Sequence, residues 1–423
     1  MGPRDQQPVR QIEAAVTKPA LQLAILGLAV PAALSAQGGL QLEARALLLG
    51  TVMRPTPLRT TLREFRLVQP VVMVSIEPLA GLVGRLTFNA EAWTLAKGEL
   101  TAGAWGEGFV DRRHPHTAWH ELLISGSTAI PCGRVGCRVG LFAGKGFVPF
   151  GSDDPMSRPI AAYPVNHHLA QILERAVVAG QASIGPVAIE ASLFNGDEPE
   201  RPWQWPKISR FADSWSGRVT VNPFRGLELS ASVARVASPE ARVGTGPTQQ
   251  KIHFAVRPQG TLGRTTLGGL AEWARTTEVD GVFRFHSLLA EGWAARGDHR
   301  VAIRFERTER PEEERVTEFR EVRPRIDNSL LGVTRWTLLT ANYGYRGAAG
   351  RFSVEPFVEG TIGSIAEIAG GIFEVASTYG GTTVKRVTLG MKLAWRDSGH
   401  RMGRYGILGH PGSQQHQHQK DDR

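Results

Sequence analysis

Alternation of apolar and polar residues with a period of two is the feature that most limits how this chain can fold. Between Arg386 and Trp395 every second residue is apolar, Leu389 among them, while Thr388 and Lys392 occupy positions in between. Successive side chains of a β-strand point to opposite faces, so this strand would carry one apolar and one polar face. Such a strand suits lipid on one side and water on the other, with Trp395 at the level of the lipid headgroups.

The same period recurs in segments from residue 85 to residue 359, and the links between the segments differ in length. Short links contain glycine, as at 185–186 and 297–298, whereas the links 195–214 and 309–328 are long and polar. Short turns and long loops in alternation are typical of transmembrane barrels. The sequence therefore predicts an all-β fold, a transmembrane antiparallel up-and-down β-barrel of about 14 strands, within a range of about 12 to 16. We expect this barrel to span residues 71–396, after a partly disordered N-terminal segment, 37–70.

The alternation by itself leaves a second fold open. A soluble antiparallel sheet also alternates, because one of its faces packs on a core and the other meets water. A periplasmic β-rich binding or structural protein is therefore the alternative that the strand pattern allows.

The N-terminus resembles a secretory signal peptide. Arg4, Arg10 and Lys18 precede the apolar stretch Leu21–Val30, and a small residue, Ala36, follows a proline break. This is the order of a charged region, an apolar region and a cleavage site. The apolar stretch is shorter than the ~20 residues that a membrane-spanning helix needs. Residues 1–36 are therefore predicted to be a signal peptide, and the protein to reach the outer membrane after export.

The C-terminal residues 397–423 differ in composition from the predicted strands. They are rich in histidine, glutamine, glycine and charge, and they show no strand period. Such composition is typical of disordered chain. We therefore expect a disordered His/Gln-rich tail.

Charge and motifs exclude several classes of function. The chain has 49 Lys and Arg against 40 Asp and Glu, a net charge of +9, but the arginines are spread out and form no dense basic run. Nucleic-acid binders usually cluster these residues, so no nucleic-acid partner is expected. The sequence lacks the nucleophile-elbow, zinc-protease and phosphate-loop motifs, and we predict that the protein is not an enzyme.

Two small groups of residues suggest local chemistry. Cys132 and Cys137 are the only cysteines, and in an oxidising compartment a pair so close predicts a disulfide across a hairpin turn. Histidines gather in two places and, with a carboxylate, could bind a first-row transition metal. The alternative is that these side chains line a loop or pore mouth, so no cofactor is expected unless it is such a metal. The candidate ligands are His114, His116, His120, His167 and His168.

One stretch resembles a known family. The segment Gly144–Gly151, GKGFVPFG, is similar to a Gly-x-Phe-x-x-Pro-Phe-Gly string of phosphate-selective-type porins, although Gly146 stands where that string has its first phenylalanine. The resemblance continues at Glu174–Val177 and Phe194–Asp197, and it covers less than a quarter of the chain. In those porins the chain after this string folds into the lumen and narrows the pore. The resemblance thus implies a constriction shaped by Phe147, Pro149, Phe150 and Arg175.

A second resemblance supports the fold and leaves the function open. The segments Asp111–His116, Asn166–His168 and Phe194–Pro199 are similar to a group of uncharacterised exported barrel-like proteins. That group has no activity that could be carried over to this chain.

These observations together predict a porin-like outer-membrane channel for the passive diffusion of small anionic or neutral solutes. The alternative is an outer-membrane barrel that binds or transports a transition metal through its histidines. The expected partners are outer-membrane lipid, small solutes and the barrel-assembly machinery, and a homo-oligomer is compatible with the pattern. Bases at inward positions of the predicted strands would set the charge of the lumen: Arg85, Arg218, Lys251, Arg257, Arg304, Arg386 and Lys392.

We predict that residues 1–36 are absent from the mature protein, because the charged, apolar and small-residue order ends at Ala36. Sequencing the N-terminus of membrane-localised protein should give Gln37 as the first residue. A sequence that begins before Leu21 would contradict the prediction.

Overall fold

The computed structural model describes residues 39–54, 61–94, 116–133, 136–152, 157–199, 201–237, 247–313, 330–369, 373–396 and 401–409. The predicted signal peptide, residues 1–36, lies outside them. The described chain is almost entirely β-structure, and its two α-helices, α2 (His167–Ala170) and α3 (Val375–Tyr379), are single turns. In the described part of the chain no helix has the length and apolar character needed to span a bilayer.

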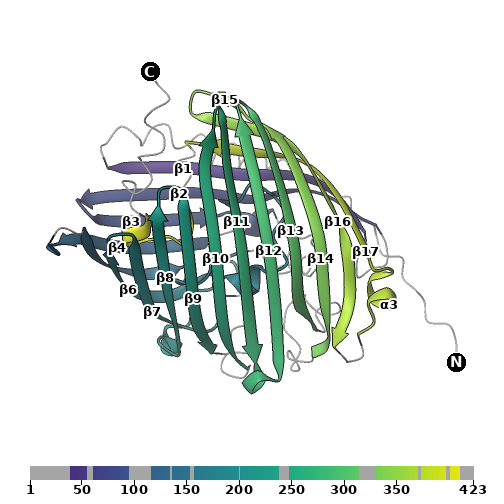
Figure 1. Ribbon diagram of the computed structural model, residues 1–423, viewed down its shortest axis with the longest axis horizontal. Coiled ribbons are helices and arrows are strands. Elements are labelled where there is room, and N and C mark those ends of the chain that lie inside the picture. Colours follow the sequence, from purple (N-terminus) through teal and green to yellow (C-terminus); the bar gives the residue numbers. More distant parts are fainter. Residues whose placement is uncertain are drawn as a thin grey trace.

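Antiparallel strands follow one another around a single sheet (Figure 1). The first nine are β1 (Leu40–Arg54), β2 (Leu62–Leu79), β3 (Leu82–Asn89), β4 (Trp119–Ile130), β5 (Cys137–Gly146), β6 (Arg175–Ile184), β7 (Val187–Phe194), β8 (Ser214–Phe224) and β9 (Leu227–Ala237). The others are β10 (Thr248–Leu262), β11 (Thr265–Glu278), β12 (Phe283–Arg296), β13 (His299–Glu313), β14 (Leu330–Tyr345), β15 (Gly347–Ala349), β16 (Phe352–Ala369) and β17 (Thr383–Trp395).

The sheet closes on itself because β1 pairs with β17 as well as with β2. The β1–β17 register runs from Ala44 opposite Trp395 to Arg54 opposite Lys385. β15 is a three-residue strand that pairs only with β16, beside the β14–β16 pairing, so 16 strands of the described chain form the wall. The structure thus has the predicted up-and-down barrel, with a strand number at the upper end of the expected range.

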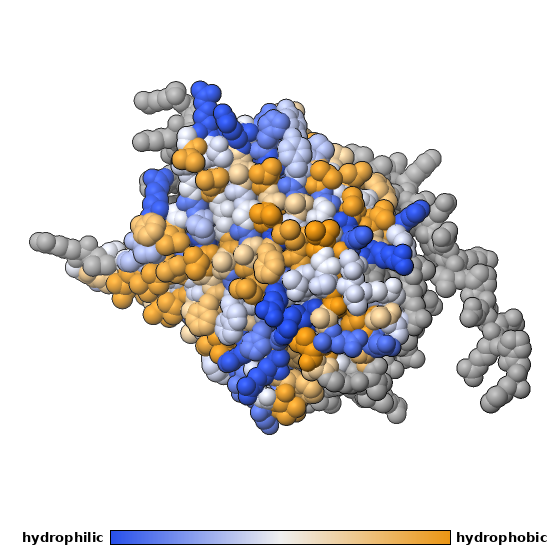
Figure 2. Space-filling view, turned by 45° about the vertical axis from the view of Figure 1, so that its right-hand side comes forward, coloured by the Kyte–Doolittle hydropathy of each residue, from blue (hydrophilic) through white to orange (hydrophobic). Residues whose placement is uncertain are grey.

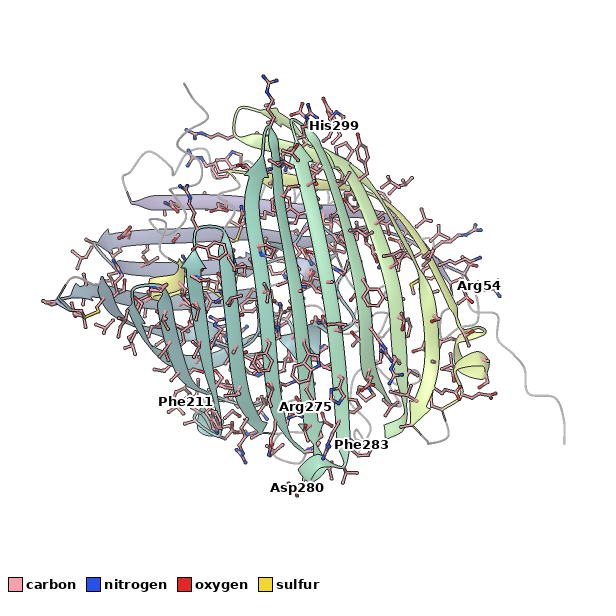
Figure 3. The ribbon with its side chains drawn as sticks, in the orientation of Figure 1. Arg54, Phe211, Arg275, Asp280, Phe283 and His299 are labelled. Atoms are coloured by element: carbon pink, nitrogen blue, oxygen red, sulfur yellow. A yellow bond between two sulfur atoms is a disulfide. The ribbon has the colours of Figure 1, made fainter. Side chains whose placement is uncertain are left out.

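Most links separate by length onto the two ends of the barrel, although the link between β11 and β12, residues 279–282, is a short one among the longer connections. Short turns join β2 to β3, β6 to β7, β8 to β9, β10 to β11 and β12 to β13 at one end, here called the short-turn end. The longer connections, such as that between β5 and β6, lie at the other end. In Figure 3, His299 at the start of β13 and Asp280 between β11 and β12 mark these opposite ends.

The period of two separates an apolar outer face from a polar inner face. On β17, Val387 and Leu389 are exposed on the outside, whereas Arg386 and Thr388 are buried on the inside. Figure 2 shows hydrophobic residues over much of this face, with hydrophilic groups interspersed among them. This surface suits the hydrocarbon of a bilayer. Trp395 has the outward parity too, but it is almost fully covered and packs with Leu42 and Ala44 instead of standing free at the membrane edge.

The barrel begins earlier in the sequence than predicted. Residues 40–54 and 62–70, expected to form a partly disordered N-terminal segment, belong to β1 and β2. The period was hidden because the inner face of β1 is apolar over its middle: Leu47 and Leu49 pack inside the barrel with Val68, Ala161 and Phe357. A strand that is apolar on both faces shows a continuous run of hydrophobic residues, which periodicity does not separate from other structures.

The C-terminal residues also differ from the expectation. Residues 401–409, predicted to be part of a disordered tail, lie inside the barrel, and Met402, Arg404 and Tyr405 are buried. We call residues 401–409 the C-terminal segment. The wall supplies partners for its charged and aromatic side chains, which composition alone could not reveal. Residues 397–400 and 410–423 lie outside the described chain.

Cys132 and Cys137 are joined by a disulfide, with their Cα atoms 5.9 Å apart. They lie at the link between β4 and β5, at the short-turn end. The described chain has no free cysteine.

We predict that Leu389→Arg lowers the free energy of unfolding by about 2–4 kcal/mol, because Leu389 lies at the middle of β17 and faces lipid. Leu389→Ala, which adds no charge, should cost clearly less. Urea titration of protein folded into lipid vesicles measures both values. Equal costs would contradict the outward assignment.

Candidate functional site: the barrel lumen and the loop folded into it

The connection between β5 and β6 enters the barrel and does not stay at its rim. We call residues 147–174 the lumen loop, of which 153–156 lie outside the described chain. Its two ends meet at Gly151, whose φ of +72° belongs to the left-handed region. A Cβ atom there would lie 1.6 Å from the carbonyl oxygen of Ala170. Only glycine fits this close approach, which explains the last residue of the GKGFVPFG string.

Carboxylates of the wall bind backbone amides of the lumen loop. Glu359 on β16 accepts hydrogen bonds from the N–H groups of Ala161 and Ala162, at 2.8 and 3.2 Å. Glu306 on β13 accepts one from the N–H of Val165, at 2.9 Å. Hydrogen bonds to an ionised acceptor are among the strong ones in proteins. These two strands therefore hold the middle of the loop across the lumen.

A third wall carboxylate, Glu272 on β11, binds side chains of the same loop. It accepts from the hydroxyl of Ser152 at 2.7 Å and from the amide of Asn166 at 3.1 Å. The guanidinium of Arg158 lies 3.3 Å from Oε1 of Glu272, and Nε2 of His253 on β10 lies 3.2 Å from Oε2. All of these groups are buried. A loop arginine thus neutralises a wall carboxylate.

Bases of the wall bind backbone carbonyls of the loop. Arg304 donates to Ala162 O at 2.7 Å, Lys251 to His168 O at 2.8 Å and Arg218 to Gly151 O at 3.4 Å. Lys392 donates to Pro159 O. The loop is therefore bound through its amides by acids and through its carbonyls by bases.

The bases predicted to set the charge of the lumen make contacts within the protein. All seven predicted bases have inward positions, but the interactions that they make are with the wall, the loop and the C-terminal segment. Arg218 pairs with Glu190 at 2.5 Å, Arg304 with Glu291 at 2.6 Å and Arg386 with Glu359 at 2.9 Å. Arg85 donates to Arg404 O at 3.0 Å, and Arg257 shares the inner face of β10 with Lys251. Most of this charge is compensated locally.

The predicted constriction residues take a different place. Phe147 and Phe150 are buried against the wall, packing with Val177 and Phe194, and they anchor the start of the loop. Arg175 at the start of β6 is tied to the link after β7 and binds Gly196 O at 3.1 Å. Pro149 is buried, and its carbonyl accepts from Ser216 at 3.0 Å. The stretch that crosses the lumen is 157–168, which the sequence pattern does not single out.

The end of the lumen loop is anchored by a buried histidine–carboxylate pair, and a second such pair lies nearby. Glu174 contacts Nδ1 of His120 at 2.5 Å, accepts from the N–H of Thr117 and lies 3.9 Å from Lys145. Glu91, after β3, contacts Nδ1 of His116 at 2.8 Å. Glu174 thus joins the end of the lumen loop to β4 and to the connection before it, whereas the Glu91–His116 pair lies within that connection.

Both carboxyl groups have lowered pKa values. Burial alone would raise the pKa of Glu174, but the charges of Lys145 and His120 bring it well below its usual range. His116 likewise lowers the pKa of Glu91 against the effect of burial. A carboxyl whose folded pKa is depressed stabilises the fold above its unfolded pKa of about 4.3, and this contribution is lost as the pH falls through the folded value.

The loop brings the described histidines of the two groups near each other. The rings of His116 and His120 are 5.3 Å apart, those of His167 and His168 are 4.0 Å apart, and Tyr163 stands between the groups. Within the described ranges no three His, Cys, Asp or Glu side chains are arranged to hold a metal ion. His114 lies outside the described residues. The positions of the described histidines fit the alternative of loop contacts.

Matches between this chain and known proteins occur among solved structures. No protein-family model matches the chain, and no curated protein matches it either. Solved structures that match include OmpT, an outer membrane protein of Vibrio cholerae in trimer form, at TM-score 0.46 and 10% identity over 84% of this chain and 99% of that chain. An anion-selective porin from Comamonas acidovorans matches at TM-score 0.45 and 9% identity, over 84% and 99%.

OmpF of Salmonella typhi, in complex with daunomycin, matches at TM-score 0.47 and 10% identity, over 85% of this chain and 98% of that chain. At these scores the fold itself rests on the strand pairing of this chain.

We predict that Glu359→Gln loosens the lumen loop. The variant loses the negative charge that pairs with Arg386, and it loses at least one of the two hydrogen bonds to loop amides. The buried groups left without partners should lower the free energy of unfolding by about 1–3 kcal/mol. Single-channel recording should then show a larger or noisier conductance. Glu43→Gln is the matched control, because Glu43 lies on the inner face of β1 beside Arg45 and its removal takes the same charge. Identical traces for both variants would contradict the role of Glu359.

Proposed function

We propose that this protein is an outer-membrane, porin-like channel through which small anionic or neutral solutes diffuse passively. The observation that carries the proposal is the closed 16-strand wall, apolar outside and charged inside, with a loop held across its interior. Barrels of about 16 strands are wide enough to leave an aqueous channel. A segment anchored from both sides of the wall narrows that channel to small solutes.

The apolar outside and charged inside of the wall also disfavour a soluble periplasmic protein and a catalytic or metal-binding lumen. A soluble periplasmic protein would expose the outward leucines, valines and phenylalanines of this wall to water, at a cost of ~25 cal/mol per Å². A catalytic or metal-binding lumen would need polar side chains directed at a ligand. The inward acids and bases described above are engaged in pairing and in loop contacts, which supports a passive role.

A group of bases near the short-turn end supports a preference for anions. Arg300, Arg346 and Lys392 all lie within 3.5 Å of one carboxylate, Glu355. Three bases thus surround one acid. The bases are 32%, 38% and 27% exposed and Glu355 only 6%, so the positive charges are the ones that meet solvent. Rings of charge in a pore select ions by the local potential.

We expect the purified protein to conduct in planar bilayers and to prefer chloride over potassium weakly, because salt at physiological strength screens charges beyond ~8 Å. Reversal potentials in a potassium chloride gradient measure this preference. Arg300→Gln with Arg346→Gln should move the reversal potential toward zero. Arg307→Gln, which removes one positive charge from the outer face of β13, should leave it unchanged, and each inward substitution made singly should shift it. Absence of conductance would refute the channel, and cation selectivity would refute the anion preference.

A further inference from the structure

The C-terminal segment lies far from the strand that it follows in the sequence. It comes after β17, yet it packs on the inner faces of β3 to β9, on the opposite part of the wall. Figure 1 shows its helical turn η7 (Gly406–Gly409), in yellow, among the purple and teal strands. The chain therefore turns back into the lumen after completing the barrel.

Two arginines of the segment converge on one wall carboxylate. Arg401 donates to both oxygens of Glu228 on β9, each at 2.9 Å. Arg404 donates to the same carboxylate at 2.9 Å and to the hydroxyl of Thr220 on β8 at 3.2 Å. A two-pronged guanidinium–carboxylate contact fixes orientation as well as position. The segment is thus held in one register along the wall.

Side chains of the wall also form hydrogen bonds with the backbone of the C-terminal segment. Arg218 on β8 donates to Gly403 O at 3.2 Å, and Arg85 on β3 donates to Arg404 O at 3.0 Å. The side-chain amide of Gln181 on β6 binds the segment twice, donating to Tyr405 O at 3.0 Å and accepting from the N–H of Ile407 at 2.9 Å. Three strands therefore satisfy backbone groups that would otherwise need water.

Tyr405 links the segment to the lumen loop. Its hydroxyl donates to Glu121 on β4 at 2.5 Å and accepts from the N–H of Phe147 at 3.2 Å. Its ring packs on Phe142 of β5 with the centroids 5.0 Å apart. A Cβ at Gly146 would lie 2.9 Å from the Tyr405 hydroxyl, so the wall is shaped for this side chain.

We propose that the C-terminal segment is a built-in plug, which occupies the β3–β9 side of the lumen, holds the start of the lumen loop and thereby limits what the channel passes. This inference rests on the proposed channel function. The segment is bound only by non-covalent contacts and is continuous with the wall at one end. Its removal would open the space that it fills. It would also take away Arg401 and Arg404 and leave Glu228 and Glu121 facing the pore.

Two truncations separate the plug from the rest of the tail. A chain ending at residue 400 lacks the plug, whereas a chain ending at Gly409 keeps it and loses only residues 410–423. Removal of the plug should raise single-channel conductance by about twofold or more, since conductance follows the narrowest open section, and should weaken the anion preference. The chain ending at Gly409 should match the full chain. Equal conductance for the two truncations would overturn the proposal.

A labelling experiment tests the plug independently of conduction. Thr220 is fully buried under Arg404, so in Thr220→Cys a water-soluble maleimide should not react in the full chain and should react once the plug is removed. Thr388→Cys is the matched control, because Thr388 is equally buried on the inner face of β17, where it bonds Thr51. Its labelling should not change with truncation.

The two readouts distinguish the two proposals. If no form conducts but labelling at position 220 appears on truncation, the channel function fails and the plug stands. If position 220 reacts equally with and without the segment, the plug fails. Should the truncated chain not fold, the full-length variant Arg401→Ala with Arg404→Ala gives the same test, with increased labelling at position 220 as the expected result and unchanged labelling as the contrary one.

Discussion

The pairing of β1 with β17 is the interaction on which the rest of the structure depends. Backbone N–H and C=O groups have no water to bind in the hydrocarbon of a bilayer, so an open sheet edge there would leave a row of unsatisfied groups. The ladder from Ala44–Trp395 to Arg54–Lys385 removes both edges at once. Closure also defines an inside. Every second side chain of each strand is then directed into a space bounded by the other strands, where charges have few partners except one another.

The contents of the lumen follow from that confinement. Acids and bases on neighbouring strands pair, as Glu190 does with Arg218 and Glu291 with Arg304. A buried charge that lost its partner would cost about 3–5 kcal/mol, so these pairs are unlike ion pairs on a surface. The remaining hydrogen-bonding capacity of the wall is met by the backbones of two segments. The lumen loop binds β11, β13 and β16, and the C-terminal segment binds β3 to β9.

Loop and C-terminal segment are coupled by their shared contact at Tyr405 and Phe147. Each segment fills a different side of the interior, and the apolar cluster that contains Met402, Tyr405 and Phe150 joins them to the wall. In a barrel with this arrangement the interior is narrowed less by the strands than by the lumen loop and the C-terminal segment. In the proposed channel these segments limit the size of the solute, and bases that meet solvent, such as Arg300, favour anions.

The amino-acid sequence alone predicts the alternating strands, the up-and-down order, and which face of β17 carries Leu389 and which carries Arg386. It does so because side-chain direction in a strand is a local property with a period of two residues. It missed β1, whose inner Leu47 and Leu49 erase the period, and it placed the constriction at Phe147 and Arg175. Two long-range contacts could be known only from the tertiary structure. Glu359 binds amides of a loop some 200 residues earlier in the chain, and Arg404 lies beside β8 and β9. Such contacts arise after barrel closure brings distant segments into one confined space, and no local pattern encodes which of them will meet there.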